Sequence, residues 1–147
     1  NAKDHLRDIA GIRVICYFID DIYNLVNALK RQSELIFIRE KDYIQNPKPN
    51  GYRSFHVIIA VPVYYLDTME YFPVEIQLRT MTMDLWASME HRVCYKKLPE
   101  HRDELAEAFC QYADILGKIE EQFEAYNETG MLEEITPAQI TENPTEG

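Results

Sequence analysis

Apolar and polar residues alternate between positions 74 and 80, and this period of two predicts a half-buried strand. One face of the strand would carry Val74, Ile76 and Leu78, and the other Glu75, Gln77 and Arg79. The polar face places a carboxylate, an amide and a guanidinium in line, roughly 6–7 Å apart by the rise of a strand. Such a row can hold a cation at one end and an anion at the other. An exposed strand face with a cross-strand ion pair would show the same pattern.

Residues 8–19 form an almost wholly apolar run that is rich in strand-forming side chains. This composition is typical of a central strand buried on both faces. Two residues break the pattern, Asp8 at the start of the run and Arg13 inside it. Because a buried guanidinium is costly unless it is paired, we expect Arg13 to have a partner or a ligand.

The middle of the chain predicts a second strand and a hairpin. Residues 35–44 form a strand in which one face would comprise Leu35, Phe37, Arg39, Lys41 and Tyr43. Residues 46–54 contain two prolines and an Asn-Gly pair, which indicate a loop. Residues 55–65 form a third strand, 66–69 a turn, and 70–80 the antiparallel return that ends the alternating segment.

Three amphipathic segments predict helices. Asp20 or Asp21 would cap a helix extending to about residue 31, and Thr80 or Thr82 would cap a second extending to about residue 97. The core stripe of the second helix would comprise Leu85, Trp86, Met89 and Val93. Residues 100–126 would form a long third helix with a heptad seam of Leu105, Phe109, Tyr112, Leu116, Ile119, Phe123 and Tyr126. We expect this seam to pack in the core, with an intersubunit contact as the alternative.

The order of elements predicts an α/β (α+β) protein, with a mixed β-sheet of about four to five strands flanked by helices. The 147 residues are 46% hydrophobic, which suits one packed domain, and we place it over residues 1–128 with an acidic, flexible tail over 129–147. No apolar run is long enough to span a membrane. The three cysteines are scattered without metal-binding or disulfide spacing, which is typical of a reducing cytoplasm.

The net charge of −10 argues against general nucleic-acid binding, since such binding depends on neutralising phosphates. The sign of the charge nevertheless varies along the chain, because glutamate dominates after Pro99, whereas the segment 39–79 contains Arg39, Lys41, Lys48, Arg53 and Arg79. A local basic pocket on an acidic protein suits a small anionic ligand.

Three features together suggest nucleotide-dependent phosphoryl transfer. Asp8 and Glu75 could hold Mg²⁺, which prefers one or two carboxylates together with substrate phosphates and water. The basic residues of the middle segment could bind phosphates, and Tyr52, which follows an Asn-Gly pair, could stack on a base. A sheet edge with solvated charges and a tyrosine in a turn would contain the same residues, so the residues alone leave both interpretations open.

Five motifs in order make the chain resemble the RelA/SpoT-type (p)ppGpp synthetase domain. They are DIAGIR at 8–13, KDYI at 41–44, PKPNGYRSFH at 47–56, VEIQLRT at 74–80 and WASMEH at 86–91. The resemblance implies a nucleotidyltransferase-like synthetase fold and a small alarmone synthetase. Its activity would be that of a GTP pyrophosphokinase, which transfers the β,γ-pyrophosphate of ATP to the ribose 3′-hydroxyl of GDP or GTP with Mg²⁺. The family's basic ATP-phosphate motif lies upstream of Asp8, so we expect N-terminal helices of the family to be missing here.

The resemblance also implies roles for individual residues. Asp8 and Glu75 would be catalytic and would hold the metal, with Glu75 also able to take the proton of the 3′-hydroxyl. ATP would be bound by Arg13, which would stack on adenine, together with Arg39 and Lys41. GDP or GTP would be bound by Lys48, Asn50, Tyr52, His56, Gln77, Arg79, Asp84, Ala87, Glu90 and His91, with Tyr52 stacked on guanine.

Asp84 is a candidate for base selection, since a carboxylate accepts hydrogen bonds from both donors on the Watson–Crick edge of guanine. A solvated charge in the first turn of a helix is the alternative. For the whole chain, the alternatives are a catalytically impaired nucleotide sensor and a relative that pyrophosphorylates adenosine nucleotides or tRNA. We expect ATP and GDP or GTP as partners, no membrane, and self-association, if present, through the helices.

Overall fold

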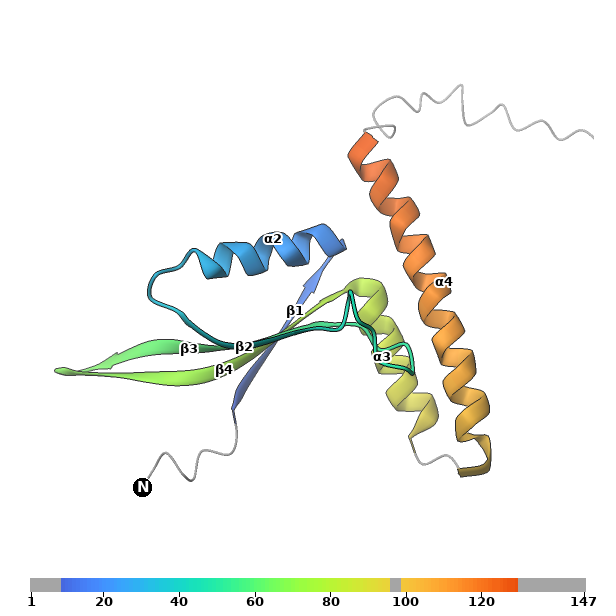
Figure 1. The fold of residues 1–147 in the computed structure, drawn as a ribbon, viewed down its shortest axis with the longest axis horizontal. Coiled ribbons are helices and arrows are strands. Elements are labelled where there is room, and N and C mark those ends of the chain that lie inside the picture. Colours follow the sequence, from blue (N-terminus) through green and yellow to red (C-terminus); the bar gives the residue numbers. More distant parts are fainter. Residues whose placement is uncertain (1–8, 96–98, 130–147) are drawn as a thin grey trace, which may run out of the picture.

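The computed structural model describes residues 9–95 and 99–129, which form one sheet and three α-helices (Figure 1). In chain order the elements are β1 (Ala10–Cys16), α2 (Ile19–Lys30), β2 (Ile36–Asp42), β3 (Phe55–Tyr65), β4 (Thr68–Thr80), α3 (Met81–Cys94), the 3₁₀ turn η1 (Pro99–His101) and α4 (Arg102–Thr129). Asp8 and the segment 130–147, most of the predicted tail, lie outside the described residues.

The four strands are arranged in the order β1-β4-β3-β2, with β1 parallel to β4 and the other pairs antiparallel. This confirms the predicted mixed sheet. The prediction that the first strand is central and buried on both faces is wrong, because β1 pairs only with β4 and forms an edge. Ile12 and Ile15 of β1 are accordingly 52% and 45% exposed.

Helix α2 covers one face of the sheet (Figure 1). Ile22 and Val26 of α2 are buried against Val57 of β3 and Leu78 of β4, and burial of such side chains stabilises the fold by about 1.5–3 kcal/mol each. The helix begins at Ile19, and its N-cap is Phe18. The prediction that Asp20 or Asp21 is the cap is therefore wrong, because both lie in the first turn of the helix. The opposite face of the sheet carries the polar residues of β4, as their alternation predicted.

A β-bulge divides β2 between Phe37 and Arg39. Phe37 is paired with Ile59, on the α2 side of the sheet, whereas Arg39 is paired with Ile58 on the opposite side. The prediction that these two residues share a face is therefore wrong, since the extra residue of a bulge reverses the alternation. The bulge brings Arg39 and Lys41 to the polar face of the sheet.

Helix α3 follows β4 directly, and Thr80 is its N-cap, as one of the two predicted positions. The predicted core stripe is wrong for Leu85, Met89 and Val93, which are exposed. The helix instead turns Met83 toward the sheet core and Trp86 toward α4, where Trp86 contacts the cluster around Phe109. Only the positions of the neighbouring elements decide which stripe is buried.

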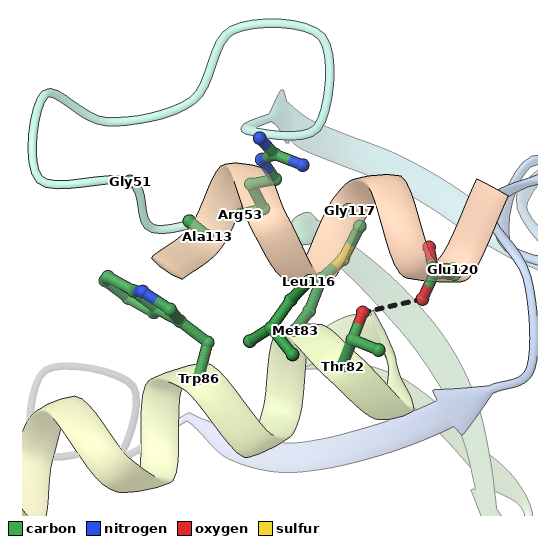
Figure 2. Close-up of a pocket in the computed structure, with 9 residues that line it drawn as sticks. All are labelled: Gly51, Arg53, Thr82, Met83, Trp86, Ala113, Leu116, Gly117 and Glu120. Carbon is green, nitrogen blue, oxygen red and sulfur yellow. Dashed lines mark hydrogen bonds between the residues drawn. The ribbon is translucent and has the colours of Figure 1, made fainter. Parts of the chain in front are cut away.

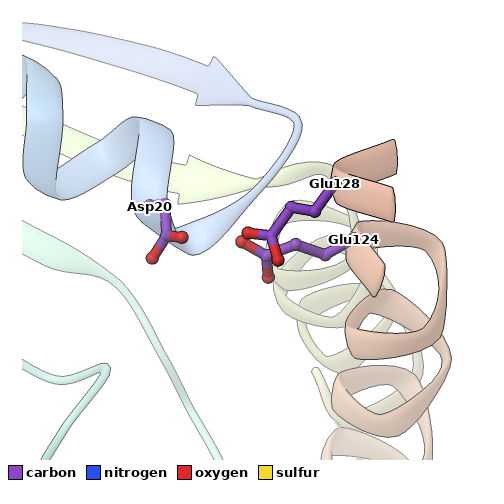
Figure 3. Close-up of side chains that lie close together, drawn as sticks. All are labelled: Asp20, Glu124 and Glu128. Carbon is purple, nitrogen blue, oxygen red and sulfur yellow. The ribbon is translucent and has the colours of Figure 1, made fainter. Parts of the chain in front are cut away.

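Helix α4 lies beside α3 and buries Phe109, Ala113 and Glu120, with Leu116 half-buried. The predicted core packing of the heptad seam is wrong for Tyr112, Ile119, Phe123 and Tyr126, all of which are exposed. Near its C-terminal end, α4 brings Glu124 and Glu128 against Asp20 of α2 (Figure 3). No helix in the described part of the chain is long and apolar enough to cross a membrane.

Candidate functional site

Polar side chains of β4 form a connected row on the sheet face opposite α2. Arg79 Nη2 donates a hydrogen bond to Gln77 Oε1 at 3.1 Å, and Gln77 Nε2 donates to Glu75 Oε1 at 3.3 Å. The strand alternation places the three side chains on one face, and their hydrogen bonds fix their relative orientation. The row that the sequence predicted is therefore present.

Tyr52 joins this row to β3 through its hydroxyl group. The hydroxyl accepts a hydrogen bond from Arg79 Nη2 at 2.8 Å and lies 2.9 Å from His56 Nε2. Since the hydroxyl accepts from Arg79, its own proton can be donated to Nε2, which leaves Nδ1 of a neutral His56 as the protonated nitrogen. Nδ1 in turn lies 3.7 Å from Glu75 Oε1.

The surroundings of the His56 ring favour its neutral form. Burial lowers its pKa below the ordinary value of 6.5. The carboxylate of Glu75 opposes this shift, and the cations Arg79, Lys48 and Lys41 add to it. A neutral ring can accept a hydrogen bond from Tyr52, which an imidazolium could not do.

Asp84, in the first turn of α3, lies between two arginines from different strands. Its Oδ1 accepts a hydrogen bond from Nη1 of Arg79 at 3.3 Å and lies 3.5 Å from Nη1 of Arg13. The side chain of Arg79 is 8% exposed, whereas that of Arg13 is 54% exposed. The Nε atom of Arg79 is buried and has no hydrogen-bond partner in the described part of the chain. Asp84 therefore orients both guanidinium groups.

Three adjoining cavities follow this face of the sheet. The first, of about 190 Å³, is lined by Arg39, Lys41, Tyr43, Lys48, His56, Ile58 and Glu75. The second, of about 240 Å³, is lined by Gly11, Ile12, Arg13, Glu75 and Gln77. The third, of about 320 Å³, is lined by Arg13, Tyr52, Arg79, Ala87, Ser88, Glu90 and His91. Glu75 is common to the first two and Arg13 to the last two, so the cavities form one continuous row.

The loop between β2 and β3 is folded onto itself where it carries Tyr52. Gly51 donates its backbone N–H to the carbonyl of Lys48 at 2.9 Å, and Lys48 donates to the carbonyl of Tyr52 at 3.1 Å. Gly51 adopts a φ of +98°, a conformation that other residues rarely accept. Asn50 Oδ1 accepts a hydrogen bond from the backbone N–H of Tyr52 at 3.0 Å, as is typical of a turn.

The cavities group the predicted site residues differently from the predicted division by substrate. Arg39 and Lys41, predicted for ATP, share a cavity with Lys48 and His56, predicted for the acceptor. Arg13 shares a cavity with Tyr52. Asn50 lines none of the three cavities, but a groove with Arg102 and Phe109 that shares Glu90 with the third cavity. Asp8 lies outside the described residues, so its predicted role stays a prediction.

Tyr43 was not predicted as a site residue. Its ring lies 5.0 Å from Lys48 Nζ and 6.0 Å from Lys41 Nζ, within the range of cation–π attraction, and makes edge contacts with Tyr52 and His56. The signal that could have identified it is its alternation with Arg39 and Lys41. Ser88, which lines the third cavity, gave no such signal.

Glu75 is a suitable ligand for a divalent cation. Its side chain is 35% exposed and it opens to two cavities, one of them rich in cations that could bind phosphate. Mg²⁺ is commonly held by one or two carboxylates together with phosphates and water, and one accessible carboxylate beside a cavity lined by cations is compatible with this requirement. Among the described residues, the only cluster of three potential metal-binding side chains is Asp20, Glu124 and Glu128, which is not part of this row.

Comparison with known proteins shows which family and which proteins this chain is similar to. The family described as the region found in RelA/SpoT proteins matches residues 1–100. The GTP pyrophosphokinase YwaC of Bacillus subtilis (strain 168) is 48% identical over 120 residues, which make up 82% of this chain and 57% of that protein. The chain thus spans little more than half the length of this relative.

Solved structures share the fold. The small alarmone synthetase 2 from Bacillus subtilis superposes with a TM-score of 0.75 at 45% identity, covering 85% of this chain and 69% of that chain. The small alarmone synthetase 1 from the same organism, bound to its product pppGpp, superposes with a TM-score of 0.73 at 29% identity. This match covers 86% of this chain and 64% of that chain. The structure of the same synthetase bound to AMPCPP superposes with a TM-score of 0.61 at 25% identity, covering 82% of this chain and 61% of that chain.

Proposed function

Because the chain belongs to the RelA/SpoT family, we propose that it acts as a GTP pyrophosphokinase. The reaction transfers the β,γ-pyrophosphate of ATP to the ribose 3′-hydroxyl of GDP or GTP, and it yields the alarmone (p)ppGpp and AMP. Two relatives support this proposal, one described as a GTP pyrophosphokinase and the other solved with pppGpp as its product. Nucleotides are accordingly the proposed ligands of the row of cavities.

The observation that carries the proposal is the position of Glu75 between two cavities. On one side lie Arg39, Lys41 and Lys48, and on the other lies Arg13. Transfer of a phosphoryl-type group needs little covalent help from a protein, because positioning and neutralisation of charge dominate. A carboxylate between a phosphate-binding cavity and a guanidinium that can cover a purine is suited to this task.

Each residue then has a role. Arg13 stacks on adenine, Arg39 and Lys41 bind phosphates, and Tyr52 stacks on guanine. Lys48 and His56 line the acceptor site, where the neutral ring of His56 avoids adding another positive charge beside Glu75. Glu75 accepts the proton of the 3′-hydroxyl. Further acceptor contacts come from the third cavity and its neighbours, through Gln77, Arg79, Asp84, Ala87, Glu90 and His91.

Mg²⁺ is the proposed metal, held by Glu75 together with Asp8. When bound, the ion would neutralise negative charge on the phosphates of the donor nucleotide. The carboxylate of Glu75 would then both hold the ion and orient the acceptor hydroxyl. The hydrogen bond from Gln77 Nε2 to Glu75 Oε1 orients the carboxylate for these two roles.

The test is to incubate the protein with γ-labelled ATP, Mg²⁺ and one acceptor at a time, and to resolve the products. We expect a labelled 3′-pyrophosphorylated product with GDP or GTP, and none when EDTA replaces Mg²⁺. A product with ADP or tRNA would establish a different acceptor. Binding of both nucleotides without any product would indicate a sensor.

The matched variant is Glu75→Gln, which keeps the shape of the side chain and removes its charge. We expect turnover to fall at least about 10²-fold, or roughly 3 kcal/mol, while the circular dichroism spectrum stays unchanged. Turnover close to that of the unmodified protein would exclude Glu75 from the mechanism.

A further inference from the structure

Helix α4 contributes none of the described side chains that line the three cavities, yet it packs against the loop that carries Lys48 and Tyr52. Figure 2 shows the contact, with Gly51 and Arg53 of the loop beside Ala113 and Gly117 of α4. The residues on either side of Tyr52 are therefore the ones that meet the helix.

Gly51 brings the backbone of the loop directly onto α4. A Cβ atom at this position would lie 3.0 Å from Cβ of Ala113 and 3.1 Å from Cα of Cys110. Both separations are shorter than ordinary van der Waals contact, and the second involves backbone that cannot move aside. The small residue therefore sets how closely the loop approaches the helix.

Arg53 lies over Gly117, the one glycine of α4. A Cβ atom at Gly117 would lie 2.5 Å from Nη1 of Arg53, so the guanidinium occupies the space that any larger residue would need. Nη2 of Arg53 donates a hydrogen bond to Oδ1 of Asp114 at 3.0 Å. The side chain of Arg53 is 23% exposed, and its Nε atom is buried. Gly117 and Asp114 thus fix the guanidinium from two sides.

Tyr52 is also tied to α4 through Trp86. The rings of Tyr52 and Trp86 are in edge contact, with centroids 6.3 Å apart. The indole Nε1 of Trp86 donates a buried hydrogen bond of 2.7 Å to the carbonyl of Phe109 in α4. Contacts with α4 therefore hold three neighbouring parts of the loop, which are Gly51, Arg53 and, through Trp86, the ring of Tyr52.

We infer that Arg53 and Gly117 are positioning residues, by which α4 holds Tyr52 and Lys48 in the orientation that binds the acceptor nucleotide. This rests on the proposed function, because it assigns the acceptor to the cavity lined by Tyr52. Displacing Arg53 would loosen the loop without removing any residue that touches the nucleotide. The affinity for the acceptor should then fall while the affinity for ATP is retained.

The principal test is Gly117→Ala, whose Cβ atom would displace Nη1 of Arg53 from its position over Gly117. Alanine is a better helix former than glycine, so a loss of function in this variant would not come from a weakened helix. We expect the dissociation constant for GDP, measured by isothermal titration calorimetry, to rise about tenfold, as for the loss of one charge-assisted hydrogen bond, and that for ATP to stay unchanged. Asp114→Asn should act in the same direction, and Glu121→Gln, an exposed carboxylate on the same helix, should have no effect.

Two further measurements separate positioning from general destabilisation. Hydrogen exchange at the backbone amides of Lys48 and Gly51 should become faster in Gly117→Ala, while exchange at Val57 in β3 stays unchanged. In an Arg53→Ala background, Gly117→Ala should cause no additional loss of GDP affinity, because the side chain that it displaces is already absent.

Unchanged GDP affinity in Gly117→Ala, or an equal loss of ATP affinity, would overturn the inference. Faster exchange throughout the sheet would do the same. If the unmodified protein bound no GDP at all, the proposed function would fail, and with it the acceptor role assigned to this contact. If the unmodified protein made (p)ppGpp and Gly117→Ala bound GDP normally, the function would stand and only the positioning role would be lost.

Discussion

At the scale of single residues, the hydroxyl group of Tyr52 connects β3 and β4 across the candidate acceptor cavity. It accepts a hydrogen bond from Arg79, which is almost fully buried, and lies within hydrogen-bond distance of His56. The aromatic ring and the hydroxyl therefore serve different purposes. In the proposed function the ring stacks on the base of the acceptor, whereas the hydroxyl accepts a hydrogen bond from the buried guanidinium of Arg79.

We predict that Tyr52→Ala and Tyr52→Phe separate these purposes. Tyr52→Ala should weaken GDP binding by about 1–3 kcal/mol, because a stacking surface is lost, and leave ATP binding nearly unchanged. Tyr52→Phe should retain most GDP affinity but lower the free energy of unfolding by about 1–3 kcal/mol, because Arg79 loses a buried acceptor. Calorimetric titration and urea unfolding measure the two effects. An equal loss of ATP and GDP affinity in Tyr52→Ala would show that Tyr52 does not belong to the acceptor site alone.

Asp84 poses a second question at this scale, because the sequence suggested that it reads guanine. In the structure its Oδ1 faces Arg79 and Arg13, which both line the third cavity, and Arg13 also lines the second. The pair with the buried Arg79 carries the greater energetic weight. The pair with Arg13, whose side chain is 54% exposed, is screened by solvent.

We therefore predict that Asp84→Ala weakens GDP binding by about 1–2 kcal/mol and ATP binding by less than about 1 kcal/mol. The preference for GDP over ADP should stay unchanged, since the arginines are displaced rather than a base-reading group. Competition titrations with GDP and ADP measure this ratio. A ratio that falls by about 1–3 kcal/mol would instead support direct recognition of guanine by Asp84.

At the scale of elements, Thr80 ends β4 and begins α3, and so links the two elements that bring Glu75 and Asp84 to the site. Its side chain is fully buried, and its Oγ1 accepts a hydrogen bond from the backbone N–H of Met83 at 3.3 Å. The hydroxyl oxygen of Thr82 lies 3.2 Å from that of Thr80. The Thr82 hydroxyl also donates a hydrogen bond of 2.7 Å to Oε1 of Glu120 in α4. The start of α3 is thereby fixed to both the sheet and α4.

We predict that Thr80→Ala lowers the free energy of unfolding by about 1–2 kcal/mol, since the first turn of α3 loses its cap. Thr80→Ser retains the hydroxyl and should lose less than half of that amount. Urea unfolding followed by the fluorescence of Trp86, the single tryptophan, measures both. Equal stability of the alanine and serine variants would mean that the hydroxyl does not act as a cap.

At the scale of the whole molecule, acidic side chains meet where the end of α4 approaches the start of α2 (Figure 3). Burial, the nearby Asp20 and a hydrogen bond to it raise the pKa of Glu124 to about 7, with Glu128 and Glu120 adding to the shift. The folded state therefore binds a proton more tightly than the unfolded chain, whose Glu has an ordinary pKa of 4.5. The resulting stability is fully present below pH 4.5 and is lost as the pH rises through about 7.

We predict that Glu124→Gln raises the free energy of unfolding at pH 8 and has little effect at pH 5. The gain should be on the order of 1 kcal/mol, because solvent screens a cluster at the surface. Urea unfolding at the two pH values gives the difference, and Glu121→Gln on the same helix serves as the control. An equal effect of Glu124→Gln at both pH values would exclude a raised pKa of Glu124 as the cause.

The sequence by itself determined the local features of this protein. Alternation over 74–80 placed Glu75, Gln77 and Arg79 on one face, because side chains in a strand point to opposite sides whatever surrounds it. The hairpin of β3 and β4 and the cap at Thr80 followed from turn and capping chemistry, which acts over a few residues.

Tertiary structure decided what depends on distant neighbours. Because β1 pairs only with β4, it forms an edge of the sheet, and this pairing brings Arg13 into the cavity that Tyr52 also lines. The bulge in β2 turns Arg39 toward the site. Several apolar stripes on α3 and α4 were compatible with burial, and the approach of the two helices to each other selected Trp86 and Phe109. The local sequence predicts the type of element and which side chains share a face, unless a bulge, as in β2, changes the face that a side chain occupies. What that side chain meets is set by chain segments far away in sequence, because burial is a property of the assembled surfaces.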